Sequence, residues 1–185
     1  PLHATVPLGE PKLPLRIELK DYAEWIDGYD PFDEHRKVTR RRSRTARSAE
    51  TYIAELCSTL SGGRKVTVEE VQSLLERYPT LLVFDGLDEV ANPELRAIVV
   101  EEIEQLITRI GRSEVRPNFQ ILVTSRPNST GLAEPDPRRF QRLRLEPLSD
   151  ALQNEYVIKW CDARNIDGAQ RSDIRRIFRD RTALD

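Results

Sequence analysis

The sequence predicts an α/β fold built on a parallel sheet. Two short apolar runs, residues 80–84 and 119–124, have the length and the flanking residues of strands that are buried on both faces. Between them, apolar residues from Leu95 to Ile110 recur at i, i+3 and i+4, which is the spacing of a helix. Strands that alternate with helices favour parallel pairing, because a helix can return the chain to the start of the next strand.

Composition limits the classes of protein to consider. The 185 residues suit one ordinary domain, and 38% hydrophobic with 32% charged residues indicate a globular chain with a polar surface. The net charge of −2 gives no general argument for binding nucleic acid or an anionic membrane. Cys57 and Cys161 are too few for a disulfide framework and fit a reducing compartment, so we expect a cytoplasmic location. No apolar run approaches the roughly 18 residues of a membrane span, so we expect no membrane partner.

Before residue 80 the sequence predicts one strand and two helices. Residues 15–20 alternate between apolar and polar, as a half-buried strand does, and a turn or helix start follows at 21–25. The first helix ends at the glycines of 61–63, and its apolar face consists of Tyr52, Ile53, Leu56, Cys57 and Leu60. The second begins with a capping-box pattern at Thr67 and ends before Pro79.

After residue 84 the sequence predicts three helices and two strands. An asparagine cap followed by Pro93 marks the start of the long helix. The apolar run at 119–124 follows it, and residues 142–146 alternate as a shorter strand does. A helix is expected after the cap residue Ser149, and a last one over 169–180, with Ile177 among its inward-facing residues.

Three carboxylates follow the apolar run at 80–84 within five positions: Asp85, Asp88 and Glu89. Carboxylates this close repel one another unless a cation or a hydrogen-bond donor offsets their charge. A single acid after a strand is often only a turn former or a helix cap. Three of them favour a divalent cation, and oxygen ligands suit Mg²⁺.

Two chemistries use such a string of residues. Chitinase-like glycosidases carry DGxDxDxE at a strand end, and Asp85, Gly86 and Asp88 match its first half. Val90 and Asn92 stand where the next Asp and the proton-donating Glu would be, so glycoside cleavage would lack its acid. The chain is also short for an eight-stranded barrel of about 250 residues. The other chemistry is that of the Walker B element, whose strand delivers a carboxylate to Mg²⁺ beside nucleotide phosphates.

The string LLVFDGLDE resembles the Walker B element of the NACHT branch of the STAND P-loop NTPases. A small residue, Gly86, follows the first acid, and further acids come later. LPLRIEL at 13–19 is similar to the family's strand after the P-loop helix, and ILVTSRP at 121–127 to its sensor 1 strand. LEPLS at 145–149 is similar to the passage into the helical domain behind the ATPase core. DGLDE followed by TSRP is a specific combination, whereas either half alone is weak.

The resemblance implies a site for ATP or ADP with Mg²⁺. Asp85 would bind the metal, and Asp88 or Glu89 would position the attacking water, with Asp88 slightly favoured. Arg126 would face the γ-phosphate as a planar cation that keeps its proton. Ser125 would either donate a hydrogen bond at this site or cap a turn, and the sequence leaves both roles open.

No P-loop is present in the sequence. The motif G-x-x-x-x-G-K-[ST] needs a lysine after its last glycine, and none of the eight glycines has one. We therefore expect a parallel-sheet P-loop NTPase core over 1–147 that lacks its P-loop strand and helix, followed by the start of a helical domain over 148–185. The absent strand would lie beside 119–124 and leave an open sheet edge there. The isolated chain is expected to be inactive as an ATPase.

The resemblance also implies a role and partners. Such proteins are nucleotide-controlled switches that oligomerise with copies of themselves and activate an effector, commonly in immunity or defence. The expected partner within the protein is an upstream P-loop segment, and the alternative role is a degenerate scaffold of the same fold. The basic run at 36–47 lacks interleaved aromatic residues, so we expect a solvated loop there rather than a nucleic-acid contact.

Overall fold

The computed structural model describes residues 11–32, 43, 46–111, 119–127 and 132–182. The chain divides into two compact units, 1–140 and 141–185. The elements of the first unit are β1 (Leu13–Glu18), α1 (Leu19–Asp27), α2 (Ala49–Leu60), α3 (Val68–Arg77), β2 (Thr80–Asp85), the 3-10 turn η1 (Leu87–Glu89), α4 (Pro93–Ile110) and β3 (Phe119–Val123). The second unit holds α5 (Asp150–Ala163) and α6 (Gly168–Thr182). Most of the basic run at 36–47 lies outside the described residues.

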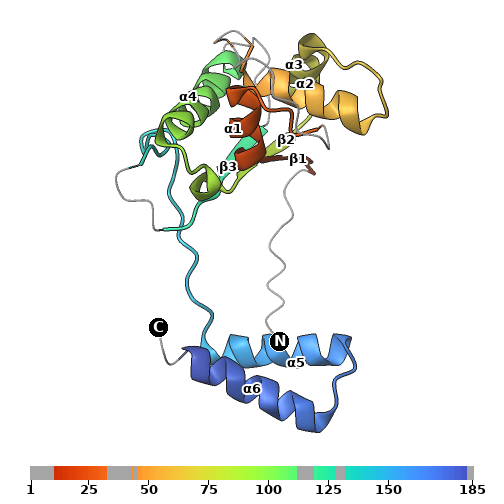
Figure 1. Ribbon diagram of the computed structural model, residues 1–185, viewed down its shortest axis with the longest axis vertical. Helices are drawn as coiled ribbons and strands as arrows, with labels where there is room; N and C mark the ends of the chain where they lie inside the picture. Colours follow the sequence, from red (N-terminus) through yellow and green to blue (C-terminus); the bar gives the residue numbers. More distant parts are fainter. Residues whose placement is uncertain (1–10, 33–42, 44–45, 112–118, 128–131, 183–185) are drawn as a thin grey trace. The chain divides into compact units, whose positions relative to one another are not determined.

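The three strands form one parallel sheet in the order β1-β2-β3 (Figure 1). The register aligns Leu13 with Thr80, and Thr80 with Phe119. Because all strands run the same way, β2 and β3 end at the same edge of the sheet. The predicted α/β class with a parallel sheet is therefore confirmed, although β1 starts and ends two residues earlier than the predicted strand at 15–20.

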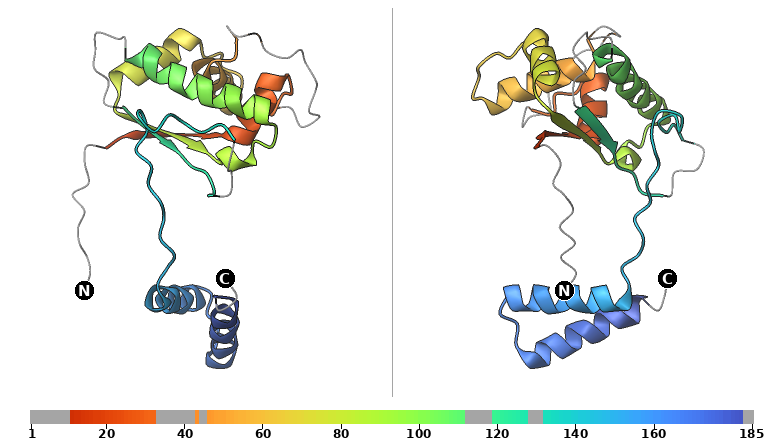
Figure 2. Two further views of the ribbon diagram at one scale, coloured as in Figure 1. Left: turned by 90° about the vertical axis from the view of Figure 1, so that its left-hand side faces the viewer. Right: turned by 180° about the vertical axis from the view of Figure 1, so that it is seen from behind.

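Helices α1 to α4 gather on one face of the sheet (Figures 1 and 2). On that face Ile17, Leu82 and Phe84 are at most 1% exposed. On the other face Val83 is half-buried and Leu122 is 46% exposed. The prediction that both apolar runs are buried on both faces was thus wrong, because none of the described helices of this unit packs on the second face, where the residues of β2 are only half-buried and Leu122 of β3 is exposed.

Local signals fix the ends of the helices. Thr67 and Glu70 form the predicted capping box at the start of α3, and the side chain of Asn92 accepts bonds from the first turn of α4, where Pro93 is the first residue. Apolar residues of α1 and α2 then pack together, with the rings of Tyr22 and Tyr52 5.0 Å apart. These contacts join α1 to α2 within the helical layer.

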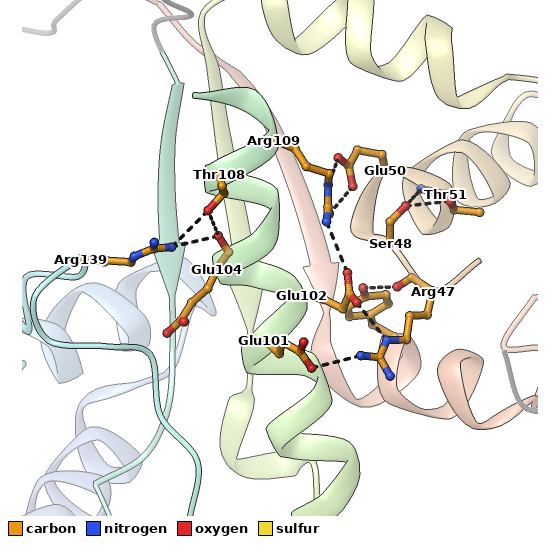
Figure 3. A network of polar contacts seen from close by, with 11 residues as sticks. Arg47, Ser48, Glu50, Thr51, Glu101, Glu102, Glu104, Thr108, Arg109 and Arg139 are labelled. Carbon is orange, nitrogen blue, oxygen red and sulfur yellow. Dashed lines mark hydrogen bonds and ion pairs between the residues drawn. The ribbon is translucent and has the colours of Figure 1, made fainter. Parts of the chain in front are cut away.

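Charged side chains of α2, α4 and Arg47, which lies two residues before α2, form a network (Figure 3). Glu50 is 1% exposed and accepts two hydrogen bonds from Arg109, both at 2.7 Å. Glu102 is 4% exposed and accepts from Nε of Arg47 at 2.9 Å. Arg47 also pairs with Glu101 at 3.1 Å. Arg47, the last cation of the basic run, therefore serves packing in the first unit.

The second unit is a pair of helices, and Ser149 caps α5 as predicted. Val157 and Cys161 are buried in this unit, whereas Ile177 is 53% exposed, so its predicted inward position was wrong. Residues 142–146 form no strand, and Leu145 is 97% exposed. An alternating segment becomes a strand only where a neighbour binds its backbone groups, and no described strand pairs with this one.

Candidate functional site

The predicted acids lie where β2 ends beside β3. Gly86 follows Asp85 with φ of 78° and ψ of 50°, a left-handed conformation that favours glycine, and this bend starts η1. The amide of Gly86 donates to the hydroxyl of Thr124 at 2.9 Å, and the amide of Leu87 donates to the Thr124 carbonyl at 2.9 Å. The ends of the two neighbouring strands are thereby joined, and the acids that follow β2 are held at this edge.

Both oxygens of Asp85 accept hydrogen bonds from the chain. Oδ1 accepts from the hydroxyl of Thr124, and Oδ2 accepts from Nε and a terminal nitrogen of Arg16 at 2.9 and 2.6 Å. These donors, the Thr124 hydroxyl first and Arg16 second, hold the pKa of Asp85 below its usual value. In return, the carboxylate raises the pKa of Arg16. Asp85 is therefore ionised at neutral pH, with 34% of its side chain exposed.

Asp88 and Arg126 meet across the gap between the strand ends. The backbone amide of Arg126 donates to Oδ1 of Asp88 at 3.0 Å, and its Nε lies 3.4 Å from Oδ2. Asp88 is 20% exposed in its side chain, whereas Arg126 is 79% exposed. The predicted metal, water and sensor residues are thus brought to one edge of the sheet, with an arginine on each of the two aspartates.

Glu89 and Ser125 stand apart from these pairs. Glu89 is exposed, and its Cδ lies 3.3 Å from the point where a Cβ on Gly86 would stand, so it folds back over the turn. The hydroxyl of Ser125 donates to the carbonyl of Arg126 at 3.2 Å, a local contact. Of the two neighbouring hydroxyl residues, Thr124 is the one that contacts the acid, while a cofactor-binding role for Ser125 stays a prediction.

Arg96 binds the turn η1 from the buried side. It is fully buried, and it donates from Nε to the carbonyl of Ala133 at 2.8 Å and from NH1 to the carbonyl of Leu87 at 3.1 Å. Its NH2 has no hydrogen-bond partner within the described part of the chain. Sequence reasoning missed Arg16, Thr124 and Arg96. Thr124 stood in the quoted TSRP motif, but nothing in the sequence showed that the strand register would bring Arg16 to Asp85.

Comparison with known families shows to which family the chain belongs. The sequence matches the family model described as NACHT domain over residues 32–164, which is more than half of the chain. The chain belongs to the NACHT family. The three-stranded parallel sheet is accordingly a partial P-loop NTPase core, of a family that binds nucleotide with Mg²⁺. No curated protein and no solved structure matches the chain.

The donor set of this NACHT chain fits Mg²⁺ held mainly by a substrate. Among the described residues, no group of three or more His, Cys, Asp or Glu side chains could hold a metal ion by itself. Mg²⁺ in nucleotide sites commonly uses one or two carboxylates, several waters and the phosphates of the substrate. Asp85, partly exposed and backed by the Thr124 hydroxyl, is a carboxylate of that kind.

No helix in the described ranges of this NACHT chain is both long enough and apolar enough to cross a membrane.

Proposed function

We propose that this NACHT chain supplies the metal-binding, water-positioning and γ-phosphate-sensing residues of an ATP-dependent switch. The observation that carries the proposal is the meeting of Asp85, Asp88 and Arg126 at one sheet edge. In open parallel sheets, ligands bind outside the carboxyl ends of the strands. Family membership supports nucleotide with Mg²⁺ as that ligand.

Each residue has a role that its surroundings support. Asp85 is ionised and would bind Mg²⁺ directly or through a water, with Thr124 fixing one of its oxygens. Asp88 or Glu89 would orient the attacking water, since Gly86 has no side chain for that task. Arg126 is highly exposed and would leave its ion pair with Asp88 to bind the γ-phosphate. Asp88 would then be able to bind the attacking water.

The phosphate grip would come from a P-loop segment outside the sequence described above. Among the described strands β3 pairs with β2 alone, so its other edge offers backbone groups to a further strand. Assembly into a homo-oligomer and control of an attached effector in defence complete the proposal, and they rest on the family membership alone.

Asp85→Asn tests the proposal in a protein that joins this chain to its P-loop segment. Binding of ATP is followed by calorimetry with and without Mg²⁺, and hydrolysis by phosphate release. We expect the substitution to remove most of the Mg²⁺-dependent gain in affinity and most of the turnover. Glu76→Gln, on the exposed surface of α3, is the control with the same charge change and should leave both unchanged.

Two results would contradict the proposal. Unchanged Mg²⁺-dependent binding and turnover in Asp85→Asn would show that this carboxylate does not hold the metal. Absence of nucleotide binding in the wild-type joined protein would favour the degenerate scaffold instead. For the isolated chain, calorimetry should show neither tight Mg²⁺-ATP binding nor hydrolysis, because no lysine-containing P-loop is present to hold the β-phosphate.

A further inference from the structure

Arg16 of β1 is the exposed partner of Asp85. The register places Arg16 opposite Val83, on the sheet face that also carries Asp85. Two of its nitrogens bind the same oxygen, Oδ2, while 62% of the Arg16 side chain stays exposed. Arg16 is therefore held at the site by its ion pairs rather than by packing. It lies outside residues 32–164, so the family match assigns it no role.

Thr124 is the fixed partner of the same carboxylate. Its amide donates to the carbonyl of Phe84 at 2.9 Å, and its carbonyl and hydroxyl accept from the amides of Leu87 and Gly86. Moving Thr124 would break the junction of the two strands. A cation that binds Asp85 must therefore take the place of Arg16.

Glu18 is a second acid within reach of Arg16. A terminal nitrogen of Arg16 lies 3.5 Å from Oε1 of Glu18, whose side chain is 58% exposed. Arginine does not lose its proton in proteins, and Asp85 is ionised at neutral pH, so at neutral pH the pair opens by exchange of cations. Glu18 gives the displaced guanidinium a partner without any movement of β1.

We propose that Arg16 is an exchangeable counter-ion, which neutralises Asp85 until Mg²⁺ replaces it and then pairs with Glu18. The proposal rests on the proposed function only in taking Asp85 as the metal-binding carboxylate. Free Mg²⁺ must displace Arg16 and gains only one carboxylate ligand in return. Mg²⁺ that arrives with a nucleotide already has phosphate oxygens as ligands, so it depends less on this carboxylate. Arg16 thus keeps the metal alone from occupying the site.

The test measures metal binding by the 185-residue chain without nucleotide. Mn²⁺ replaces Mg²⁺ as the probe, and the EPR signal of free Mn²⁺ gives the bound fraction. A unit charge about 4 Å from a divalent ion changes the ion's affinity roughly thirtyfold in water at low ionic strength, so Arg16→Gln should bind Mn²⁺ that much more tightly than the wild type. Arg64→Gln, at an exposed arginine between α2 and α3, is the charge-matched control and should change nothing. Adding Asp85→Asn to Arg16→Gln should remove the gain.

Equal Mn²⁺ affinity in Arg16→Gln and wild type would overturn the proposal, and so would a gain that survives Asp85→Asn. If Arg16→Gln does not fold, the wild type decides by NMR. Mg²⁺ should then shift the Nε–H signal of Arg16 together with the Asp85 carboxyl signal, and a shift of the carboxyl alone would overturn the exchange. Because no nucleotide is present, a failure of nucleotide binding in the joined protein leaves this result standing, and a failure here leaves that experiment intact.

Discussion

Asp85 keeps its negative charge because donors from both neighbouring strands bind it. Arg16 comes from β1 on one side and Thr124 follows β3 on the other. Asp88 is likewise offset by Arg126. The repulsion expected at Asp85 and Asp88 is therefore reduced by the chain's own donors.

Thr124→Val should raise the pKa of Asp85 toward its ordinary value. The change removes the donor to Oδ1 and the acceptor for Gly86, at nearly constant side-chain volume, and should lower the free energy of unfolding by about 1 kcal/mol at neutral pH. A carboxyl whose pKa is lowered by folding stabilises the fold above its unfolded pKa, and this contribution disappears as the pH falls through the lowered value. The Asp85 part of the loss should therefore vanish in acid.

Carboxyl NMR titration and urea unfolding at neutral and acid pH measure these effects. Ser125→Ala is the matched control, because its hydroxyl contacts only the carbonyl of Arg126 among the contacts described above. An unchanged pKa of Asp85 in Thr124→Val would show that Arg16 alone lowers it.

Gly86→Ala should cost about 1–2 kcal/mol of stability, because an L-residue is strained in a left-handed conformation. Gly62→Ala is the control for backbone strain, since Gly62 has φ of 74° and open space around it. A Cβ at residue 86 would meet only the flexible end of Glu89, which is exposed. Chemical unfolding should thus give equal losses in the free energy of unfolding for the two variants. A larger loss for Gly86→Ala would mean that the Glu89 side chain is held in place.

At the scale of elements, the sequence predicted what local chemistry determines. The capping box at Thr67 and the cap at Asn92 fixed the starts of α3 and α4, since both signals act within one turn. The strand at 142–146 was wrong, because alternation shows that a segment can pair but not that a neighbour exists. The contacts of Arg16 were missed for the same reason, since they depend on register between strands distant in sequence.

Of the two neighbouring acids Glu101 and Glu102 in α4, Glu102 should contribute more to the free energy of unfolding. Glu102→Gln leaves Arg47 and Arg109 facing a buried neutral group, and we expect a loss of about 2–3 kcal/mol. Glu101→Gln removes a contact to the same Arg47 from an acid whose side chain is 42% exposed, so the loss should stay below about 1 kcal/mol. Thermal and urea unfolding compare the two, and equal losses would contradict the assigned burial.

At the scale of the whole molecule, the two units differ in what holds them together. The first has a continuous apolar core between sheet and helices, whereas in the described part of the second only Val157 and Cys161 are buried. Residues 141–185 should therefore be largely unfolded as a peptide, because short helices without a core are marginal in water. Circular dichroism should show low helicity for 141–185 and a cooperative transition for 1–140. A stable helical signal from the peptide would contradict this.

The pairing of β1 with β2 has a consequence for synthesis on the ribosome. β1 is complete at residue 18, but its partner residues are 80–85, beyond three helices. A nascent chain must therefore carry β1 without its backbone partner while α1, α2 and α3 emerge, and closing so long a loop makes this pairing a late and slow event. During that interval the unpaired segment Leu13–Glu18 is available to chaperones. Translation through residue 85 sets the earliest moment at which β1 and β2 can pair. The acid edge can form only later, after β3 with Thr124 and Arg126 has been made.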